Sequence, residues 1–138
     1  GKLRWHYGDT EKFLCQFSNH AAAESKVKWR NKLCRDGVNY LARVSYFKSN
    51  QWGVYDMYGN VAEWTEDCTH YDYKGAPQDS SVPWTLVGGP NNGTCNDRIH
   101  RGGSWLQSGG TVSSGARQFT KASERQVTIG FRVVKELE

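Results

Sequence analysis

Alternating polar and apolar positions are few along this chain, and each run of them is short. Residues 41–47 alternate and are rich in β-prone side chains, and similar short segments recur at 61–67, 98–101 and 129–134. We predict a strand at each of these segments. The pattern therefore indicates short strands joined by long connections.

Helical periodicity is weak throughout the sequence. Residues 54–59 can form one or two helical turns that Gly59 ends, and residues 19–24 can form a short helix. A helix as short as 19–24 needs tertiary packing to be stable. We therefore expect little helix.

Two long segments lack an apolar pattern. Residues 69–93 are rich in Gly, Pro, Asp, Asn and Ser, which predicts a long surface loop. The triplet at 92–94 fits a glycosylation sequon and also a plain turn, which we favour. Residues 106–128 cannot bury themselves, so we expect them to lie exposed over the core, either as a binding surface or as a mobile loop without a ligand.

The composition indicates that aromatic residues contribute to the core, which the pattern of apolar positions does not show. Hydrophobic residues make up only 37% of the 138 residues, but 6 Trp and 7 Tyr are many for this length. Length predicts a single domain. We expect aromatic rings to supply much of its core.

The charge balance excludes some partners. The net charge of +4 comes from 18 basic and 14 acidic residues that are interspersed, which disfavours a nucleic-acid partner because such a partner needs a clustered basic face. No apolar stretch approaches the length of a membrane span, and the first residues do not form a signal peptide. We expect the chain to be soluble as given.

The spacing of the cysteines favours disulfides over a metal site. Cys15, Cys34, Cys68 and Cys95 form no C-x-x-C pair, and no histidine lies at zinc-finger spacing. We predict two disulfides, and hence a periplasmic or extracellular location, with four reduced thiols as the alternative. Among three possible connectivities we favour Cys15 with Cys34 and Cys68 with Cys95, since each pair closes a short loop.

The stretch 52–67 mixes carboxylates with large rings. Asp56, the carbonyls of 59–61 and Glu63 can supply several oxygens to a hard cation such as Ca²⁺. The twelve-residue ladder of an EF-hand is absent. The alternative is a capped turn with surface acids.

Three motifs occur in order along the chain. They are Trp52-Gly-Val-Tyr-Asp-Met-Tyr-Gly-Asn-Val-Ala-Glu-Trp64, Arg101-Gly-Gly-Ser-Trp105 and Ile129-Gly-Phe-Arg-Val133. Together they resemble the formylglycine-generating enzyme (sulfatase-modifying factor) family. The resemblance implies an α+β variant of the C-type lectin fold, loop-rich with short strands. It also implies that residues 1–138 are the C-terminal portion of a single domain, whose missing N-terminal half would be a partner.

The same resemblance implies up to two calcium ions. The first site would use the Asn19 side chain, the His20 carbonyl, the Asp36 carboxylate and the Val38 carbonyl. The second would use Asp56, backbone oxygens of Gly59 or Asn60 and of Val61, and Glu63. The stretch 52–67 then becomes a calcium-organised hub, with Trp52 and Trp64 as core rings.

The catalytic residues of the family do not carry over. Its enzymes bind copper through two cysteines that follow the Arg-Gly-Gly-Ser-Trp motif, and the matching positions are Gln107 and Val112. Copper(I) needs sulfur ligands, so the sequence does not support copper. A second catalytic branch uses iron-binding histidines from an additional domain. We interpret the scattered His6, His20, His70 and His100 as core or surface residues.

These observations favour a non-catalytic recognition module that binds a protein or a small molecule. In one group of relatives the segment between the second and third motifs is the variable surface. The corresponding candidate residues are Gln107, Ser108, Thr111, Gln118, Phe119, Lys121, Glu124 and Gln126, which suit adaptable contacts. The alternatives are part of a formylglycine-generating oxidoreductase and a structural piece of a larger assembly.

Overall fold

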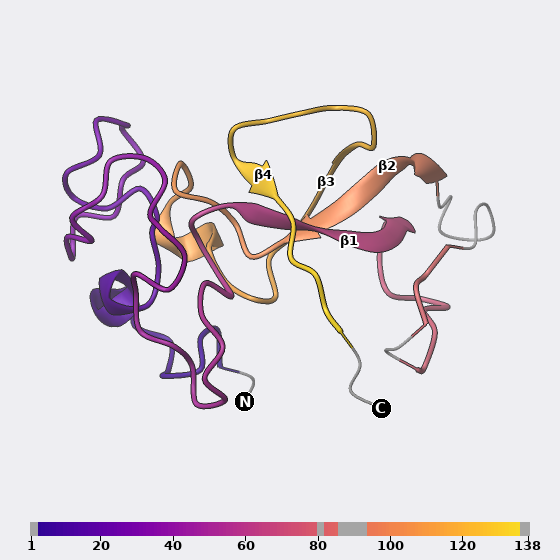
Figure 1. Cartoon of the computed structure of the whole chain (residues 1–138), viewed down its shortest axis with the longest axis horizontal. Helices are drawn as coiled ribbons and strands as arrows, with labels where there is room; N and C mark the ends of the chain where they lie inside the picture. The colour runs from indigo at the N-terminus through magenta and orange to yellow at the C-terminus, as the bar shows by residue number, and fades with distance from the viewer. Residues whose placement is uncertain (1–2, 80–81, 86–93, 136–138) are drawn as a thin grey trace.

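The computed structural model describes residues 3–79, 82–85 and 94–135. Two short 3₁₀ helices and four strands occur in this part of the chain (Figure 1). In chain order they are η1 (Glu11–Gln16), β1 (Ala62–Thr69), β2 (Thr94–Arg101), η2 (Gly109–Thr111), β3 (Arg117–Lys121) and β4 (Ile129–Gly130). The remaining described residues are loops and turns, as the weak periodicity predicts.

The four strands form one mixed sheet in the order β3-β2-β1-β4. Strands β1 and β2 are antiparallel, β2 and β3 are antiparallel, and the short β4 runs parallel to β1. In Figure 1 the N-terminal loops and η1 lie to one side of this sheet. The loop that follows β1 lies at the opposite end.

Two of the predicted strands are confirmed and two are corrected. The strand expected at 61–67 is found as β1, shifted by one or two residues, and the strand expected at 98–101 is found as β2, which begins four residues earlier. The strand expected at 129–134 is only two residues long, because 131–135 have no neighbouring strand in the described structure. The segment 41–47 is not a strand, and Ser45 has a φ of 62°, which breaks an extended backbone.

Both helical predictions are wrong. Residues 19–24 instead bond to distant loops, with the Ala21 amide donating to the Gln107 carbonyl at 2.9 Å. Residues 54–59 turn sharply at Asp56, whose φ is 54° and cannot continue a right-handed helix. The longer of the two helical segments that do form, η1, begins after Thr10, whose side chain accepts a hydrogen bond from the Lys12 amide.

The segment 106–128 is more ordered than its composition indicates. It contains η2 and β3, and all five residues of β3 pair with β2. The polar strand is stabilised by its hydrogen-bonded neighbour rather than by a buried apolar face. The segment 69–93 contains no helix or strand beyond Thr69 in its described part, and the possible sequon at 92–94 lies mostly outside the described residues.

Aromatic rings supply much of the core, as the composition predicts. Trp5, Leu14, Tyr58 and Val112 form the buried cluster, with Tyr7 and Phe17 packed against it. The Trp5 indole donates to the Val112 carbonyl at 2.6 Å, which ties the N-terminal arm to the end of η2. Trp52 does not join this core, since its side chain is 74% exposed.

Three loops meet through their backbones at Gly59 and Asn60. The Asn60 amide donates to the Asn19 carbonyl at 2.7 Å, and the Asn60 carbonyl accepts from the Trp105 amide at 2.9 Å. Gly59 has a φ of 77° and touches Asn19 so closely that an added Cβ would lie 2.3 Å from its carbonyl oxygen. We call this crossing the backbone junction.

Two disulfides are present with the predicted pairing, Cys15–Cys34 and Cys68–Cys95. The first joins η1 to the loop at 31–36, and the second joins β1 to β2. Both bonds are compatible with a periplasmic or extracellular location. In the part of the chain that the structure describes, no helix is long and apolar enough to cross a membrane.

Candidate functional site

A hollow of about 470 Å³ lies where β2 and β3 meet the loops at 104–107 and 126–129. Its lining side chains are uncharged. The one titratable group among them is His100, and burial lowers the pKa of this imidazole, which favours the neutral form. We call it the amide-lined hollow. The lining residues are Trp29, Ala62, His100, Ser104, Leu106, Gln107, Gln118, Phe119, Thr120, Gln126, Thr128 and Ile129.

Glutamine amides organise one wall of the hollow. The Gln107 Oε1 accepts from the Ser104 amide at 2.9 Å, and its Nε2 donates to the Gln118 Oε1 at 2.8 Å. Gly103, with a φ of 77°, permits this arrangement, since an added Cβ would lie 2.9 Å from the Gln107 Oε1. The amides are therefore held in place before any ligand binds.

Two exposed rings flank the amides. Phe119 on β3 is 62% exposed, and Trp29 is 58% exposed. The Trp29 indole donates to the Leu106 carbonyl at 2.9 Å, which fixes the ring at the mouth of the hollow. Large rigid rings beside hydrogen-bonding amides are typical of recognition surfaces.

His100 lies at the base of the hollow on β2. Its Nε2 is 3.1 Å from the Thr120 hydroxyl, and its ring packs edge-on against Trp64 with centroids 5.5 Å apart. The Nδ1 atom is buried without a hydrogen-bond partner. A ligand group that reaches this atom would satisfy it.

The structure divides the eight residues predicted as a ligand surface into two groups. Four of them line the hollow together: Gln107, Gln118, Phe119 and Gln126. Four lie outside its lining: Ser108, Thr111, Lys121 and Glu124. Ser108 and Thr111 are linked across η2, where the Thr111 hydroxyl donates to the Ser108 carbonyl at 2.9 Å.

Sequence reasoning missed Trp29 and His100. Trp29 is 78 positions from Gln107, and nothing in the basic segment around it indicates that this ring reaches the hollow. From the sequence, His100 is one of four scattered histidines with no sign of a shared site. Only the pairing of β2 with β3, which places His100 opposite Gln118, brings it to the site.

The two positions that correspond, by resemblance, to the thiol positions of the family lie in different environments. Gln107 lines the hollow, whereas Val112 is fully buried in the aromatic core. All four cysteine sulfurs are in disulfides, and neither disulfide lines the hollow.

The first set of implied calcium ligands surrounds a buried carboxylate. Asp36 accepts hydrogen bonds from the His20 and Val38 amides, each at 3.0 Å, and burial raises its pKa to about 6. The Asn19 Oδ1 is buried and has no hydrogen-bond partner. Carboxylate and amide oxygens are the ligand types that a hard cation prefers.

Glu24 adds a second carboxylate to this set. One of its oxygens accepts from the Gly37 amide, and the other is buried without a partner. Its charge contributes to the raised pKa of Asp36, although burial of Asp36 contributes more. Glu24 is thus a further possible calcium ligand, which the sequence did not single out.

The second set of implied ligands is already occupied by protein groups. Arg132 donates to both oxygens of Glu63 at 2.8–3.1 Å, and it also donates to the Asp56 carbonyl at 3.1 Å. The Asp56 carboxylate accepts from the Ser45 amide at 2.9 Å. Because Arg132 supplies positive charge to Glu63, this set fits a cation less well than the first.

The backbone oxygens of the second set of implied calcium ligands also have protein partners or belong to loop crossings. The Asn60 carbonyl accepts from Trp105, and Gly59 belongs to the backbone junction. Val61 follows the junction and is half-buried. These residues connect loops in the structure.

The fold and the hollow together define a class: a loop-rich α+β scaffold, stapled by disulfides, that carries a pocket at the end of a short-stranded sheet. Residues 1–137 match the family described as the sulfatase-modifying factor enzyme 1-like domain, and the chain belongs to this family. Its fold is accordingly the formylglycine-generating-enzyme-like variant of the C-type lectin fold.

Relatives of known sequence include two proteins named serine/threonine-protein kinase pkn1. The protein from Chlamydia caviae is 36% identical over 93 residues, and the protein from Chlamydia pneumoniae is 33% identical over 95 residues. The matches cover 67% and 68% of this chain. The chain spans only 14% of the length of each relative.

Two solved structures share the fold. PvdO from Pseudomonas aeruginosa has a TM-score of 0.68 and 33% identity, covering 85% of this chain and 38% of that protein. Treponema denticola variable protein 1 has a TM-score of 0.62 and 25% identity, covering 94% of this chain and 40% of that protein.

Proposed function

We propose that this domain is a non-catalytic recognition module that binds its ligand, a protein or a small molecule, in the amide-lined hollow. One observation carries the proposal: rigid amides and exposed rings share a hollow that no sulfur atom lines. Gln107 stands where the family's enzymes place a thiol, and its amide is bonded into the wall.

The lining indicates what kind of ligand groups would bind. Gln118 and Gln126 offer amide donors and acceptors, and Phe119 offers a flat apolar surface. A strongly charged ligand would bind unfavourably between uncharged walls, because it would lose its hydration without gaining an opposite charge. We therefore expect uncharged polar groups next to an apolar or aromatic group.

The test selects ligands and then removes one ring. The whole chain is immobilised with its disulfides intact and screened with a displayed peptide library and a carbohydrate array. We expect the selected ligands to bind Phe119→Ala at least tenfold more weakly, since buried rings carry much of the binding energy in such sites.

Tyr71→Ala is the matched control, because Tyr71 is 94% exposed and does not line the hollow. It should bind as the wild type does. Ligands that lose affinity equally with both variants, or with neither, would exclude the hollow as the binding site.

The second candidate function is that of an oxidoreductase, or part of one, and the family membership favours it. It predicts copper-dependent oxygen consumption with a cysteine-containing peptide. We expect no such consumption, since Gln107 and Val112 supply no thiolate. The kinase names of the relatives describe those proteins, which are several times longer than this chain.

We further propose that calcium binds at Asn19, Asp36 and the carbonyls of His20 and Val38. The buried carboxylate and the unpartnered Asn19 oxygen support this site. Calcium would hold together the loops that support the backbone junction. We also propose a periplasmic or extracellular location, which the two disulfides support.

Finally, we propose that the chain works as the C-terminal portion of a larger domain. Phe131, Val133 and Val134 are largely exposed after β4, and Phe131 lines a second hollow of about 450 Å³ together with Val54. Exposed apolar side chains that gather in this way indicate a surface that another polypeptide segment covers.

A further inference from the structure

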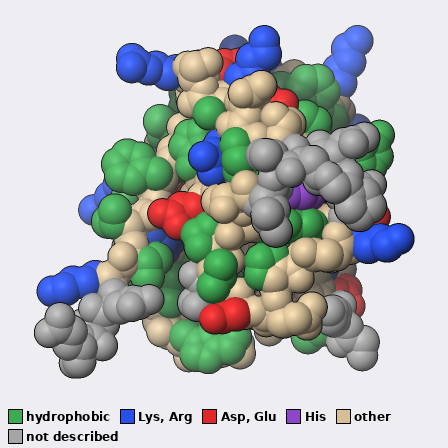
Figure 2. Space-filling model, turned by 90° about the vertical axis from the view of Figure 1, so that its right-hand side faces the viewer, with side chains coloured by type: hydrophobic (Ala, Val, Ile, Leu, Met, Phe, Trp, Pro, Cys, Tyr) green, Lys and Arg blue, Asp and Glu red, His purple; other side chains and the backbone are tan. Residues whose placement is uncertain are grey.

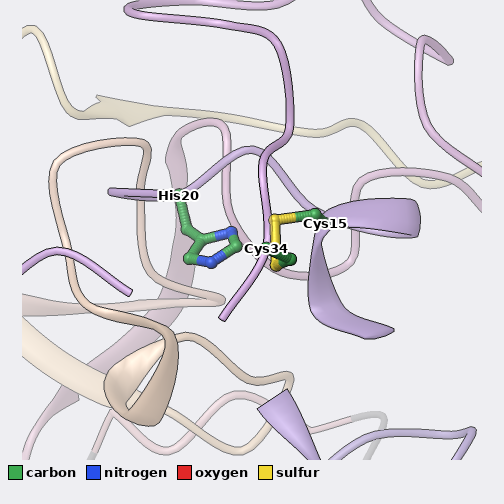
Figure 3. A group of neighbouring side chains, drawn as sticks. All are labelled: Cys15, His20 and Cys34. Atoms are coloured by element: carbon green, nitrogen blue, oxygen red, sulfur yellow. A yellow bond between two sulfur atoms is a disulfide. The ribbon is translucent and has the colours of Figure 1, made fainter. Parts of the chain in front are cut away.

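Three potential ligand atoms for a soft metal ion lie together beside η1. They are the sulfurs of Cys15 and Cys34 and a ring nitrogen of His20, and all lie within 4.8 Å of one another. Figure 3 shows the imidazole next to the Cys15–Cys34 bond. The spacing of these three residues along the chain does not match that of zinc-finger ligands, so the sequence gives no sign of this cluster.

Hydrogen bonds determine which nitrogen of His20 is unprotonated. Nδ1 lies 3.3 Å from the Ser18 carbonyl oxygen, which can only accept, so Nδ1 carries the proton. Nε2 is then unprotonated and accepts from the Asn31 amide group at 3.1 Å. The same Asn31 nitrogen is 3.7 Å from the Cys34 sulfur, so the Asn31 amide bridges the Nε2 lone pair and this sulfur, and it must rotate aside for an ion to bind.

This arrangement matches that of a metal-binding histidine. Such residues commonly donate their second ring N–H to a backbone carbonyl, which fixes the tautomer and the ring orientation. His20 is fully buried, with an exposed fraction of 1%, so the ring does not need to be ordered when an ion arrives. Its side chain is prepared for a ligand role that the disulfide blocks.

We propose that reduction of the Cys15–Cys34 disulfide creates a binding site for a thiophilic divalent ion of the zinc class, held by both thiolates and His20 Nε2. A dithiol reductant supplies two electrons and two protons, which break the S–S bond and form two thiols. The ion then displaces both protons to solvent. A small-molecule disulfide can reverse the step: it takes two electrons from the two thiolates and leaves as two thiols, which restores the Cys15–Cys34 bond and releases the ion.

Only small movements are needed to form this site. Zinc bonds of about 2.3 Å to sulfur and about 2.1 Å to nitrogen in a tetrahedron place the two sulfurs about 3.8 Å apart and each sulfur about 3.6 Å from the nitrogen. Reduced sulfurs must separate in any case, because they no longer share a bond. The present separations of up to 4.8 Å are close to those values, and a water molecule would complete the tetrahedron.

The second disulfide provides an internal control. Within the described residues, the only group of three such side chains is Cys15, His20 and Cys34. The ring of His70 is instead stacked on Trp84, with centroids 3.6 Å apart, although His70 follows Cys68 closely in sequence. Reduction of Cys68–Cys95 should therefore create no comparable site.

The experiment uses the whole chain, reduced anaerobically with a phosphine and titrated with Co²⁺ as a spectroscopic probe. We compare Cys68→Ser/Cys95→Ser, which keeps the proposed site, with Cys15→Ser/Cys34→Ser, which removes it. We expect the first variant to bind one ion per chain with thiolate-to-cobalt charge-transfer bands, which Zn²⁺ abolishes by displacement. The second should show no such bands.

His20→Asn tests the nitrogen ligand in the background of Cys68→Ser/Cys95→Ser. We expect at least a tenfold weaker affinity for Zn²⁺, measured by competition with a chelating dye. An unchanged affinity would overturn the assignment of His20. Charge-transfer bands that persist in Cys15→Ser/Cys34→Ser would overturn the site as a whole.

A final measurement covers the case in which the reduced chain unfolds. The near-ultraviolet circular dichroism of the buried Trp5 reports native packing, and we expect Zn²⁺ to restore or keep this signal. Metal binding by a chain that stays unfolded would contradict the proposal, because the ligands would then not be arranged by the fold.

Discussion

At the scale of single residues, Gly59 determines whether two loops can cross. Its φ of 77° is costly for any other residue, and an added Cβ would lie 2.1 Å from the Ser18 hydroxyl oxygen and 2.3 Å from the Asn19 carbonyl oxygen. One of these contacts is with backbone, which cannot rotate away. The backbone junction therefore has no room for a side chain at this position.

We predict that Gly59→Ala lowers the free energy of unfolding by roughly 3 kcal/mol or more, from backbone strain and overpacking together. Urea denaturation measures this loss. Gly75→Ala is the control, because Gly75 has a φ of 82° but no atom within 4 Å of an added Cβ, so strain alone costs about 1 kcal/mol. Equal losses in the two variants would show that the close contact is unimportant.

Asp36 is the residue whose replacement tests the calcium site. At 100 times its Kd, calcium bound at the proposed site would stabilise the folded chain by about 2.7 kcal/mol, because the proposed ligands come together only on folding. We predict that calcium raises the melting temperature of the wild type relative to chelator and that Asp36→Asn abolishes the increase. Differential scanning calorimetry gives both values.

Glu63→Gln separates the two implied calcium sites. Arg132 already neutralises the Glu63 carboxylate, so we expect the calcium-dependent increase to persist in this variant. If Glu63→Gln lost the calcium-dependent increase in melting temperature while Asp36→Asn kept it, calcium would bind at the second set of ligands and not at the first.

At the scale of elements, β1 and β2 form the centre of the sheet, and their pairing is irregular. The register shifts between Trp64 and Cys68 and again between Cys68 and Thr69. Hydrogen bonds alone therefore hold this end of the pair weakly. The Cys68–Cys95 disulfide compensates by a covalent link between the two strands.

We predict that Cys68→Ser/Cys95→Ser lowers the free energy of unfolding by about 3–4 kcal/mol, the chain-entropy value for a loop of this size. The sequence separation is 27 residues, which the bond constrains in the unfolded chain. Denaturation of the oxidised variant beside the wild type measures the loss. A change below about 1 kcal/mol would mean that the strand pairing needs no such link.

At the scale of the whole molecule, much apolar surface is exposed. Figure 2 shows hydrophobic side chains spread over one face, between Lys and Arg side chains that project from its edges. The segment after β4 adds Val133 and Val134, each 86% exposed. Isolated exposed side chains are ordinary, but several exposed apolar residues in one short segment, one of which lines a hollow, indicate an interface.

We predict that the isolated chain binds a hydrophobic fluorescent dye and self-associates as its concentration rises. The double variant Phe131→Ser/Val133→Ser should reduce both effects, because it removes exposed apolar area from the lining of the second hollow and from the segment that follows β4. Val127→Ser is the control, since Val127 is equally exposed and lies outside that hollow. Fluorescence and sedimentation velocity measure the two effects, and an equal reduction in the control would contradict the assignment of this surface.

The amino-acid sequence by itself determined the aromatic core, the two central strands, the disulfide pairing and the family, because each of these has a local signature. Trp5 and Tyr58 supply large rings to the core, and 61–67 carries a short strand-prone run that becomes β1. Motif spacing and loop length are likewise properties of the chain alone.

The tertiary structure alone decided which residues share a site. Strand β3 has no apolar pattern and exists because β2 pairs with it, and this pairing brings His100 to Gln118. Arg132 meets Glu63 across 69 positions, and His20 meets two cysteines at the edge of η1. Such contacts depend on how distant loops cross, and loops without a repeating pattern carry no local signal of where they cross.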